Sequence, residues 1–166
     1  MRVRRVSVSY MAVLVSCLFP GCSRRPQEPG RYYDWRKGFS IRFPEGWEER
    51  KPDFAIAVKR GNPDETAEIG VQVQKIASTQ TLAAGFSHMK SYTRTGGGGV
   101  ERDGETVIDG QDAYWFVAHV ADRQMLYFLT KKDNYLYAII VTADADTFTE
   151  DFEAEMTEVA ESLRFE

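Results

Sequence analysis

Apolar and polar residues alternate along three runs in the first half of the chain, which is the period-2 pattern of half-buried β-strands. Turn-forming residues separate these runs, with Pro44-Glu45-Gly46 after the first and Gly61-Asn62-Pro63 after the second. Each run predicts one strand whose apolar positions share a face, and a short extended piece is expected from Trp47. The alternating positions are Phe39, Ile41 and Phe43, then Phe54, Ile56 and Val58, then Ile69, Val71 and Val73.

Four longer runs in the second half predict consecutive strands over residues 100–107, 113–121, 124–131 and 135–143. An Asp109-Gly110 pair between the first two is a strong signal for a tight hairpin turn. The last three runs do not alternate cleanly and carry apolar residues on both faces. Central strands of this kind are buried on both sides, so the sequence predicts a sheet that is covered on both faces.

Two segments with helical spacing provide this cover. Leu82, Phe86 and Met89 predict a helix that begins after Thr79 or Thr81 and ends at the glycine run 96–99, which is expected to be a flexible connector. A second helix is expected over about residues 147–163, with Asp146 as its N-terminal cap. The predicted fold class is α+β, an antiparallel sheet of about six to seven strands sandwiched between helices. The apolar stripe of the second helix consists of Phe148, Phe152, Met156, Val159 and Leu163.

Residues 1–22 differ in character from the rest of the chain. Three arginines precede an apolar run over residues 6–19, and this order is the layout of a secretory signal peptide. The apolar run is shorter than the ~20 residues of a transmembrane helix. The end of this run resembles the signal of bacterial lipoproteins, in which a small residue precedes a cysteine that becomes the lipidated N-terminus. Ser16 precedes Cys17 and Gly21 precedes Cys22, so one of these two cysteines is the expected lipidation site.

The predicted organisation is a lipoprotein signal peptide over residues 1–22, a polar tether with two prolines over residues 23–31 and one folded domain over residues 32–166. The whole chain has a formal net charge of −4, which argues against nucleic-acid binding. Residues 1–22 hold three of the 21 basic residues and no acidic residue, so residues 23–166 carry 18 basic and 25 acidic residues, a net charge of −7. Because anionic headgroups repel an acidic domain, we expect membrane attachment through the lipid.

The segment 38–47, with the sequence GFSIRFPEGW, resembles the opening of the PsbP/Mog1/DcrB-like family. The order that follows is also similar, with a helix, the Asp109-Gly110 hairpin, long strands and a closing helix that ends in ESLRF. The resemblance covers residues 32–166 and implies an α/β/α sandwich. Family members are binding or assembly proteins, among them an extrinsic subunit of photosystem II, a partner of a nuclear transport GTPase and envelope lipoproteins. No site motif of a member matches this chain, so the resemblance assigns no functional residue.

Residues with catalytic or metal-binding chemistry are sparse. His88 and His119 are the only histidines, fewer than the three protein ligands of a typical zinc site. No serine lies in a G-x-S-x-G motif, and the acidic run from Asp144 to Glu155 lacks the glycine that an EF-hand calcium loop has at its sixth position. The sequence therefore predicts a protein that is not an enzyme and that uses no metal ion or cofactor.

Four aromatic residues near the start of the predicted domain are the candidate interface: Tyr32, Tyr33, Trp35 and Trp47. The alternative is that they form a small second core around the first strands. We expect a monomeric, lipid-anchored protein of the bacterial cell envelope, with its domain in the periplasm or outside the cell. It binds a partner protein or assists the assembly of a membrane complex. Alternatively, the domain binds a small apolar or lipidic ligand, which requires a large apolar pocket between the sheet and a helix.

Overall fold

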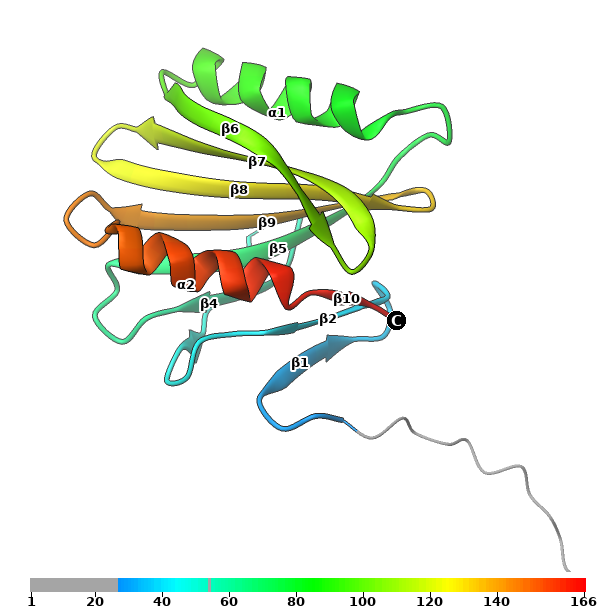
Figure 1. Ribbon diagram of the computed structural model, residues 1–166. Coiled ribbons are helices and arrows are strands. Elements are labelled where there is room, and N and C mark those ends of the chain that lie inside the picture. Colours follow the sequence, from blue (N-terminus) through cyan, green and yellow to red (C-terminus); the bar gives the residue numbers. More distant parts are fainter. Residues whose placement is uncertain (1–26, 54) are drawn as a thin grey trace, which may run out of the picture.

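The computed structural model describes residues 27–53 and 55–166. Its strands pair antiparallel in two sheets, and two helices pack against them (Figure 1). This arrangement confirms the predicted α+β class. The predicted signal peptide (1–22), with Cys17 and Cys22, and residues 23–26 of the predicted tether (23–31) lie outside the described residues.

The larger sheet has seven strands in the order β3-β4-β5-β9-β8-β7-β6. Strands β6 to β9 form a continuous meander of 10-residue strands, because a tight turn joins each strand to the next. In the first of these turns, Asp109 has a φ of 48° and Gly110 a φ of 73°, the positive values that a two-residue hairpin loop favours. The strands are β3 (Glu48–Glu49), β4 (Ile56–Gly61), β5 (Ala67–Lys75), β6 (Gly99–Ile108), β7 (Gln111–Val120), β8 (Arg123–Lys132) and β9 (Tyr135–Asp144).

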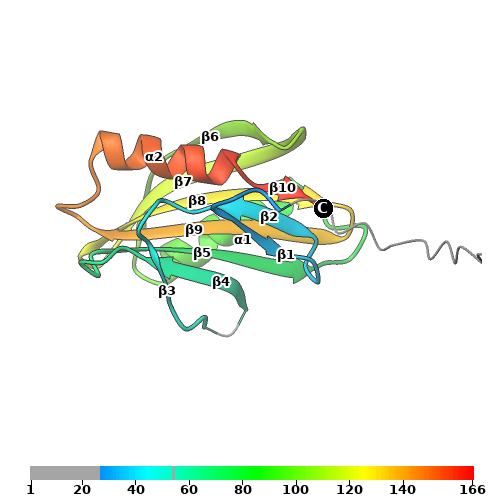
Figure 2. The same cartoon turned by 90° about the horizontal axis from the view of Figure 1, so that it is seen from below.

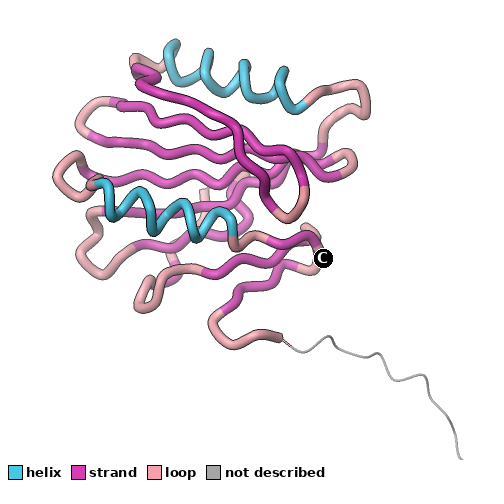
Figure 3. The backbone as a smooth tube through the Cα atoms, viewed as in Figure 1, coloured by secondary structure: helices cyan, strands magenta, loops and turns pink. Residues whose placement is uncertain are grey.

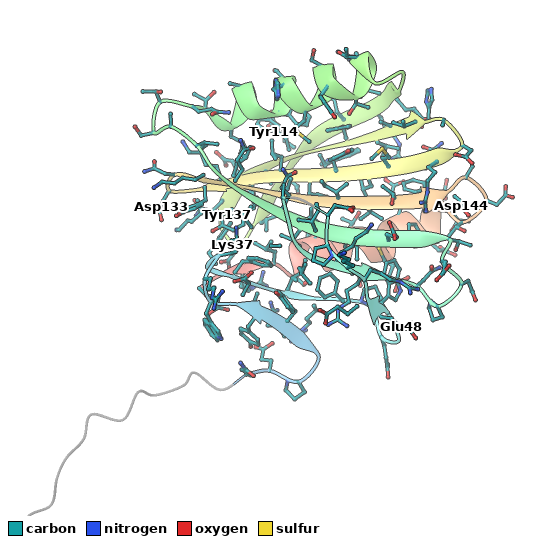
Figure 4. All side chains as sticks on the ribbon, turned by 180° about the vertical axis from the view of Figure 1, so that it is seen from behind. Lys37, Glu48, Tyr114, Asp133, Tyr137 and Asp144 are labelled. Atoms are coloured by element: carbon teal, nitrogen blue, oxygen red, sulfur yellow. The ribbon has the colours of Figure 1, made fainter. Side chains whose placement is uncertain are left out.

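A smaller sheet of three strands lies beside the larger one and has β2 in its centre. The sequence pattern predicts β2 but neither edge strand, because RYYD in β1 does not alternate between apolar and polar residues and β10 has two residues only. The side chain of Tyr137 in β9 connects the two sheets by donating a hydrogen bond to the carbonyl of Lys37 at 2.9 Å (Figure 4). The three strands are β1 (Arg31–Asp34), β2 (Phe39–Arg42) and β10 (Arg164–Phe165).

The helices α1 (Leu82–Thr95) and α2 (Glu150–Glu161) lie on opposite faces of the larger sheet (Figure 2 and Figure 3). Thr81 caps α1, since its hydroxyl accepts a hydrogen bond from the backbone N–H of Ala84 at 3.1 Å. The predicted cap of α2 is wrong. Thr149, not Asp146, accepts the capping hydrogen bond, from the N–H of Phe152 at 3.2 Å. The helix therefore begins at Glu150, after a turn that follows β9.

Each helix encloses an apolar core against the sheet, and the core under α2 extends to the inner face of the smaller sheet. In the core under α1, the rings of Phe116 and Tyr127 stack with their centroids 4.6 Å apart. Buried apolar side chains thus pack in both helix–sheet layers. The core under α2 includes Phe39, Ile41, Ile69, Val71, Leu126, Ile139, Met156 and Leu163. The core under α1 consists of Ile76, Phe86, Phe116, Ala118, Tyr127, Leu129, Leu136 and Ala138.

The glycine run 96–99 forms a defined turn instead of the expected flexible connector. Gly97 has a φ of 85°, and the N–H groups of Gly97 and Gly98 donate hydrogen bonds to the carbonyls of Arg94 and Thr93 at 3.1 and 3.0 Å. This pair of bonds is a Schellman motif, which satisfies the free carbonyls at a helix end. Strand β6 begins directly after this turn.

A β-bulge in β4 changes the direction of one predicted core residue. Ile56 lies opposite Gln72 of β5, whereas Val58 lies opposite Val71, so one extra residue intervenes in β4. Val58 consequently points into the core under α2, while Ile56 points to the α1 face of the sheet. The prediction that both side chains share a face is therefore wrong, because alternation holds only along an unbroken ladder. Phe54, the third residue of that pattern, lies outside the described residues.

Candidate functional site

Three of the four predicted interface aromatics line one groove of about 820 Å³. Tyr32 and Tyr33 come from β1, and Trp47 follows the turn after β2. We call this the entry groove, because part of its wall is the segment through which the chain enters the domain. The other lining residues are Gln27, Pro29, Gly30, Arg31, Phe43, Pro44, Glu45, Gly46 and Arg60.

Tyr32 connects the entry groove to the core under α2. Its ring packs against Phe39 at 6.0 Å and Phe43 at 6.2 Å between centroids, and half-buried Trp47 packs against the same cluster. Burial raises the pKa of Tyr32 above its usual value, so the hydroxyl stays protonated at neutral pH. These aromatics therefore combine both roles that the sequence left open: they extend the core and also line a groove.

Trp35 does not line the groove but continues its aromatic surface from Tyr33. The two rings stack with centroids 5.1 Å apart and planes 19° apart. Trp35 is 50% exposed in the turn between β1 and β2, and the hydroxyl of Tyr33 accepts a hydrogen bond from the N–H of Glu28 at 2.9 Å. The structure thus places all four predicted aromatics in the entry groove or next to it.

Two arginines line the entry groove, and the guanidinium of Arg60 lies 3.8 Å from the carboxylate of Glu49. The guanidinium of Arg60 lies 5.7 Å from the ring centroid of Phe43 and donates a hydrogen bond to the carbonyl of Trp47 at 3.5 Å. The Nε of Arg60 is buried without a hydrogen-bond partner among the described residues. Arg31 is held by the carboxylate of Glu28 at 3.2 Å. Flat rings next to guanidinium donors suit an extended peptide, which stacks on the rings and offers carbonyl acceptors.

A second groove, of about 390 Å³, lies on the α1 face of the larger sheet. Helix α1 packs mainly on β6, β7 and β8, and neither helix of the described residues lies over β4 and β5 on this face (Figure 4). We call this the sheet groove. Its apolar floor consists of Ile56, Gly70, Val120, Met125 and Ile140, and its polar rim consists of Asp53, Lys59, Glu68, Arg123 and Thr142.

The sequence analysis missed the sheet groove. Its one local signal is Gly70 inside an apolar strand, since a glycine there often marks a bulge or the close approach of another group. A Cβ at position 70 would lie 3.2 Å from Cγ2 of Ile56, so the isoleucine occupies the space above the glycine. Both grooves lie beside the helix–sheet layers, whereas the ligand-binding alternative predicts an apolar pocket between the sheet and a helix. A third hollow, of about 310 Å³, lies between α2 and strands β6 to β8, and charged residues such as Arg102 and Glu153 contribute to its lining.

The histidines lie apart from each other. His119 in β7 is half-exposed, and its Nδ1 lies 3.2 Å from a carboxylate oxygen of Glu101. His88 is exposed on α1. Across residues 27–53 and 55–166, no three His, Cys, Asp or Glu side chains are grouped so that they could hold a metal ion. In the same part of the chain, no helix has the length and hydropathy needed to cross a bilayer.

Comparison with known proteins identifies the fold. No protein-family model matches the chain, and no curated protein matches it. The solution structure of cyanobacterial PsbP (CyanoP) from Synechocystis matches 82% of this chain and 91% of its own, with a TM-score of 0.67 and 18% identity. The chain has a PsbP-like fold.

Two further solved structures share this PsbP-like fold. LpqN of Mycobacterium tuberculosis, which is involved in cell envelope biogenesis, matches with a TM-score of 0.59 and 10% identity over 82% of this chain and 84% of its own. A protein from Bacteroides thetaiotaomicron matches 82% of this chain with a TM-score of 0.57 and 16% identity. The match covers 48% of that protein, so this chain spans about half its length. Identities this low establish the fold alone.

Proposed function

We propose that this protein is a lipid-anchored component of the bacterial cell envelope whose PsbP-like domain binds a partner protein in the entry groove and assists the assembly of a membrane complex. The observation that carries the proposal is the convergence of Tyr32, Tyr33, Trp47 and Arg60 on one groove. Tyrosine, tryptophan and arginine are the residue types that dominate binding hot spots. An extended segment of the partner stacks on the rings and places acceptor oxygens against the guanidinium of Arg60.

The distribution of charge along the chain supports a position of the entry groove near the membrane. Residues 23–60 hold 10 basic and 6 acidic side chains, a net charge of +4, whereas residues 61–166 hold 8 basic and 19 acidic side chains, a net charge of −11. The overall charge of −7 thus conceals a basic entry region that anionic headgroups do not repel. The involvement of LpqN in cell envelope biogenesis agrees with this location.

The expected tether also keeps the entry groove close to the bilayer. Residues 23–31 span about 30 Å at most when fully extended. A membrane protein with a short segment outside the bilayer therefore lies within reach of the groove. The proposed partner is such a protein, and the lipid anchor raises the local concentration of the groove around it.

The proposed anchor predicts that one cysteine carries the lipid. Only one of the variants Cys17→Ala and Cys22→Ala is expected to lose an alkyne-tagged fatty acid and to leave the membrane fraction, because only the residue that becomes the N-terminus is acylated. Mass spectrometry of the mature N-terminal peptide identifies that residue. Tag that persists in the variant with both cysteines replaced would contradict lipid anchoring.

A photoreactive amino acid in the entry groove tests partner binding in living cells. p-Benzoylphenylalanine at the exposed rim position Glu45 is expected to form one discrete protein adduct on irradiation, because the bound segment lies against this rim. The same residue at Tyr92, which is 72% exposed on α1, is the control and is expected to lack that adduct. Mass spectrometry then identifies the captured protein and the segment of it that was crosslinked.

A second variant links the adduct to the aromatic side chains. Trp47→Ala, combined with the photoreactive residue at Glu45, is expected to weaken binding roughly 30-fold, because the loss of a hot-spot aromatic costs about 2 kcal/mol or more. Tyr92→Ala is the matched surface variant and leaves the adduct unchanged. If positions 45 and 92 gave equal adducts, or if position 45 gave none, the entry groove would not be the partner site.

A further inference from the structure

We infer that the sheet groove is a second binding site, which takes a hydrocarbon chain such as the acyl chain of a fatty acid or lipid. This inference goes beyond the proposed partner binding, because the sheet groove lies on the α1 face, whereas the entry groove adjoins the core under α2. The inference rests on three observations: the space beside α1, the apolar floor of the groove and the ion pairs on its rim.

The fold leaves open the space that an occupant needs. Helix α1 packs mainly on β6, β7 and β8, and the groove lies beyond it, over parts of β4, β5 and β9 and the adjoining ends of β7 and β8. Gly70 of β5 lies between Lys59 of β4 and Ile140 of β9 in the sheet and contributes no side chain. The resulting space of about 390 Å³ lies within the range of small-molecule sites, about 300–1,000 Å³.

The bulge in β4 makes the floor of the groove apolar. In an unbroken ladder Ile56 would point with Val58 toward the core under α2, but the extra residue turns it to the other face, above Gly70. Bulges are over-represented next to active sites, where they redirect a side chain. Here the redirected isoleucine completes an apolar surface that would otherwise end at β9.

The floor exposes hydrocarbon to solvent. Ile56, Val120, Met125 and Ile140 all line the groove, and none of them is fully buried. Removing this surface from water is favourable in proportion to its apolar area. Met125 adds an unbranched, flexible thioether that adapts to occupants of different shape. The floor therefore matches an apolar chain and offers few polar groups to orient a small polar molecule.

The charges on the rim are already paired, which specifies an uncharged occupant. The ammonium of Lys59 lies 2.8 Å from a carboxylate oxygen of Glu68 and 3.4 Å from one of Asp53, and its hydrogen bond with Glu68 raises the pKa of the lysine. The guanidinium of Arg123 lies 3.4 Å from the carboxylate of Asp144 at the end of β9. Both cations are paired with carboxylates, while the buried Nε of Arg123 has no hydrogen-bond partner among the described residues. Because the two charges are paired, the groove holds the hydrocarbon part of a ligand and leaves a charged head in solvent.

Photolabelling of the full chain in isolated membranes tests this site. The probe is a palmitic acid analogue with a diazirine in its chain and a terminal alkyne. After irradiation and tryptic digestion, we expect label in peptides 124–131 and 133–164, which contain Met125 and Ile140. Peptide 91–94, which contains the exposed Tyr92, reports non-specific labelling, and the N-terminal cysteine peptide reports only the anchor.

A matched pair of variants locates the label. Met125→Gln places an amide in the apolar floor and is expected to lower the labelling of peptide 133–164 about fivefold or more, while the sequence of that peptide is unchanged. Met89→Gln makes the same change at a half-buried methionine of α1 that lies outside the groove, and it is expected to leave the labelling unchanged. Equal losses in both variants would overturn the assignment to the groove.

Two competitors and a second probe distinguish the chemistry and its source. Unlabelled palmitic acid and its methyl ester are expected to compete equally, because each cation of the rim already has a carboxylate partner. Competition by the acid alone would overturn the inference of an uncharged occupant. If only the fatty acid probe labels the groove, the ligand is a free fatty acid. If a phosphatidylglycerol with the same diazirine chain also labels it, the groove binds membrane lipids as well. Label from neither, or as much label in peptide 91–94, overturns the site.

Discussion

Replacement of Phe39 by alanine is expected to lower the free energy of unfolding by about 3–5 kcal/mol. The side chain is fully buried in β2, where it packs edge-on against Tyr137 of β9 at 6.2 Å and contacts Tyr32 at 6.0 Å between centroids. Alanine leaves a cavity at the junction of the two sheets and removes both ring contacts. The loss is a large part of the ~5–15 kcal/mol that stabilises a typical domain.

Urea denaturation followed by circular dichroism measures this change. Tyr92→Ala, at a largely exposed aromatic on α1, is the matched control and is expected to change stability by no more than about 0.5 kcal/mol. Because Tyr32 and Tyr33 belong to the smaller sheet, Phe39→Ala also weakens the wall of the entry groove and lowers the adduct from position 45. If the variant lost less than about 1 kcal/mol, typical of an average surface or core substitution, the smaller sheet would not share the cooperative core.

The spacing of apolar residues and the turn-forming residues predicted most of the larger sheet, because its long strands show a recognisable pattern of apolar positions. The meander over β6–β9 combines both-sided apolar runs with an Asp109-Gly110 turn, and the spacing of Leu82 and Phe86 defines α1. The short edge strands β1 and β10 gave no such signal, since pairing with β2 and burial against the core create them. The start of α2 was misplaced because Asp146 and Thr149 are both good capping residues, and local preference does not choose between them.

The candidate sites also differ in how far the sequence could predict them. The entry aromatics are near in sequence, so their convergence was predictable, but Arg60 joins them only through the pairing of β3 with β4. The sheet groove depends on a bulge that redirects Ile56 and on Gly70 from the neighbouring strand, and alternation alone predicts the opposite direction for the isoleucine. A total charge likewise conceals the difference between the basic entry region and the acidic remainder. Sites made by long-range pairing are therefore the part that the sequence pattern did not reveal.

Through Tyr127 alone, the stability of the domain is expected to fall by up to about 2.7 kcal/mol as the pH rises from below 10 to above 12. Burial in the core under α1 raises the pKa of Tyr127 to about 12, from 10.0 for a free phenol. The folded state therefore holds the phenolic proton more tightly than the unfolded state. This stabilisation is fully present below pH 10 and is lost as the pH rises through the pKa of the folded state.

Tyr127→Phe isolates this effect, because it removes the ionisable hydroxyl, which lies 4.0 Å from the sulfur of Met125, and keeps the ring that stacks on Phe116. Over this pH range, the stability of the wild-type protein measured by urea unfolding is expected to fall relative to that of Tyr127→Phe, so the difference between the two stability curves changes with rising pH. Burial also raises the pKa values of Tyr32 and Tyr137, but both residues are present in the two proteins, so the difference between the curves reports Tyr127. Parallel curves would mean that the phenol ionises in the folded domain without cost. The core under α1 would then admit water beside Met125, a residue that this core shares with the floor of the sheet groove.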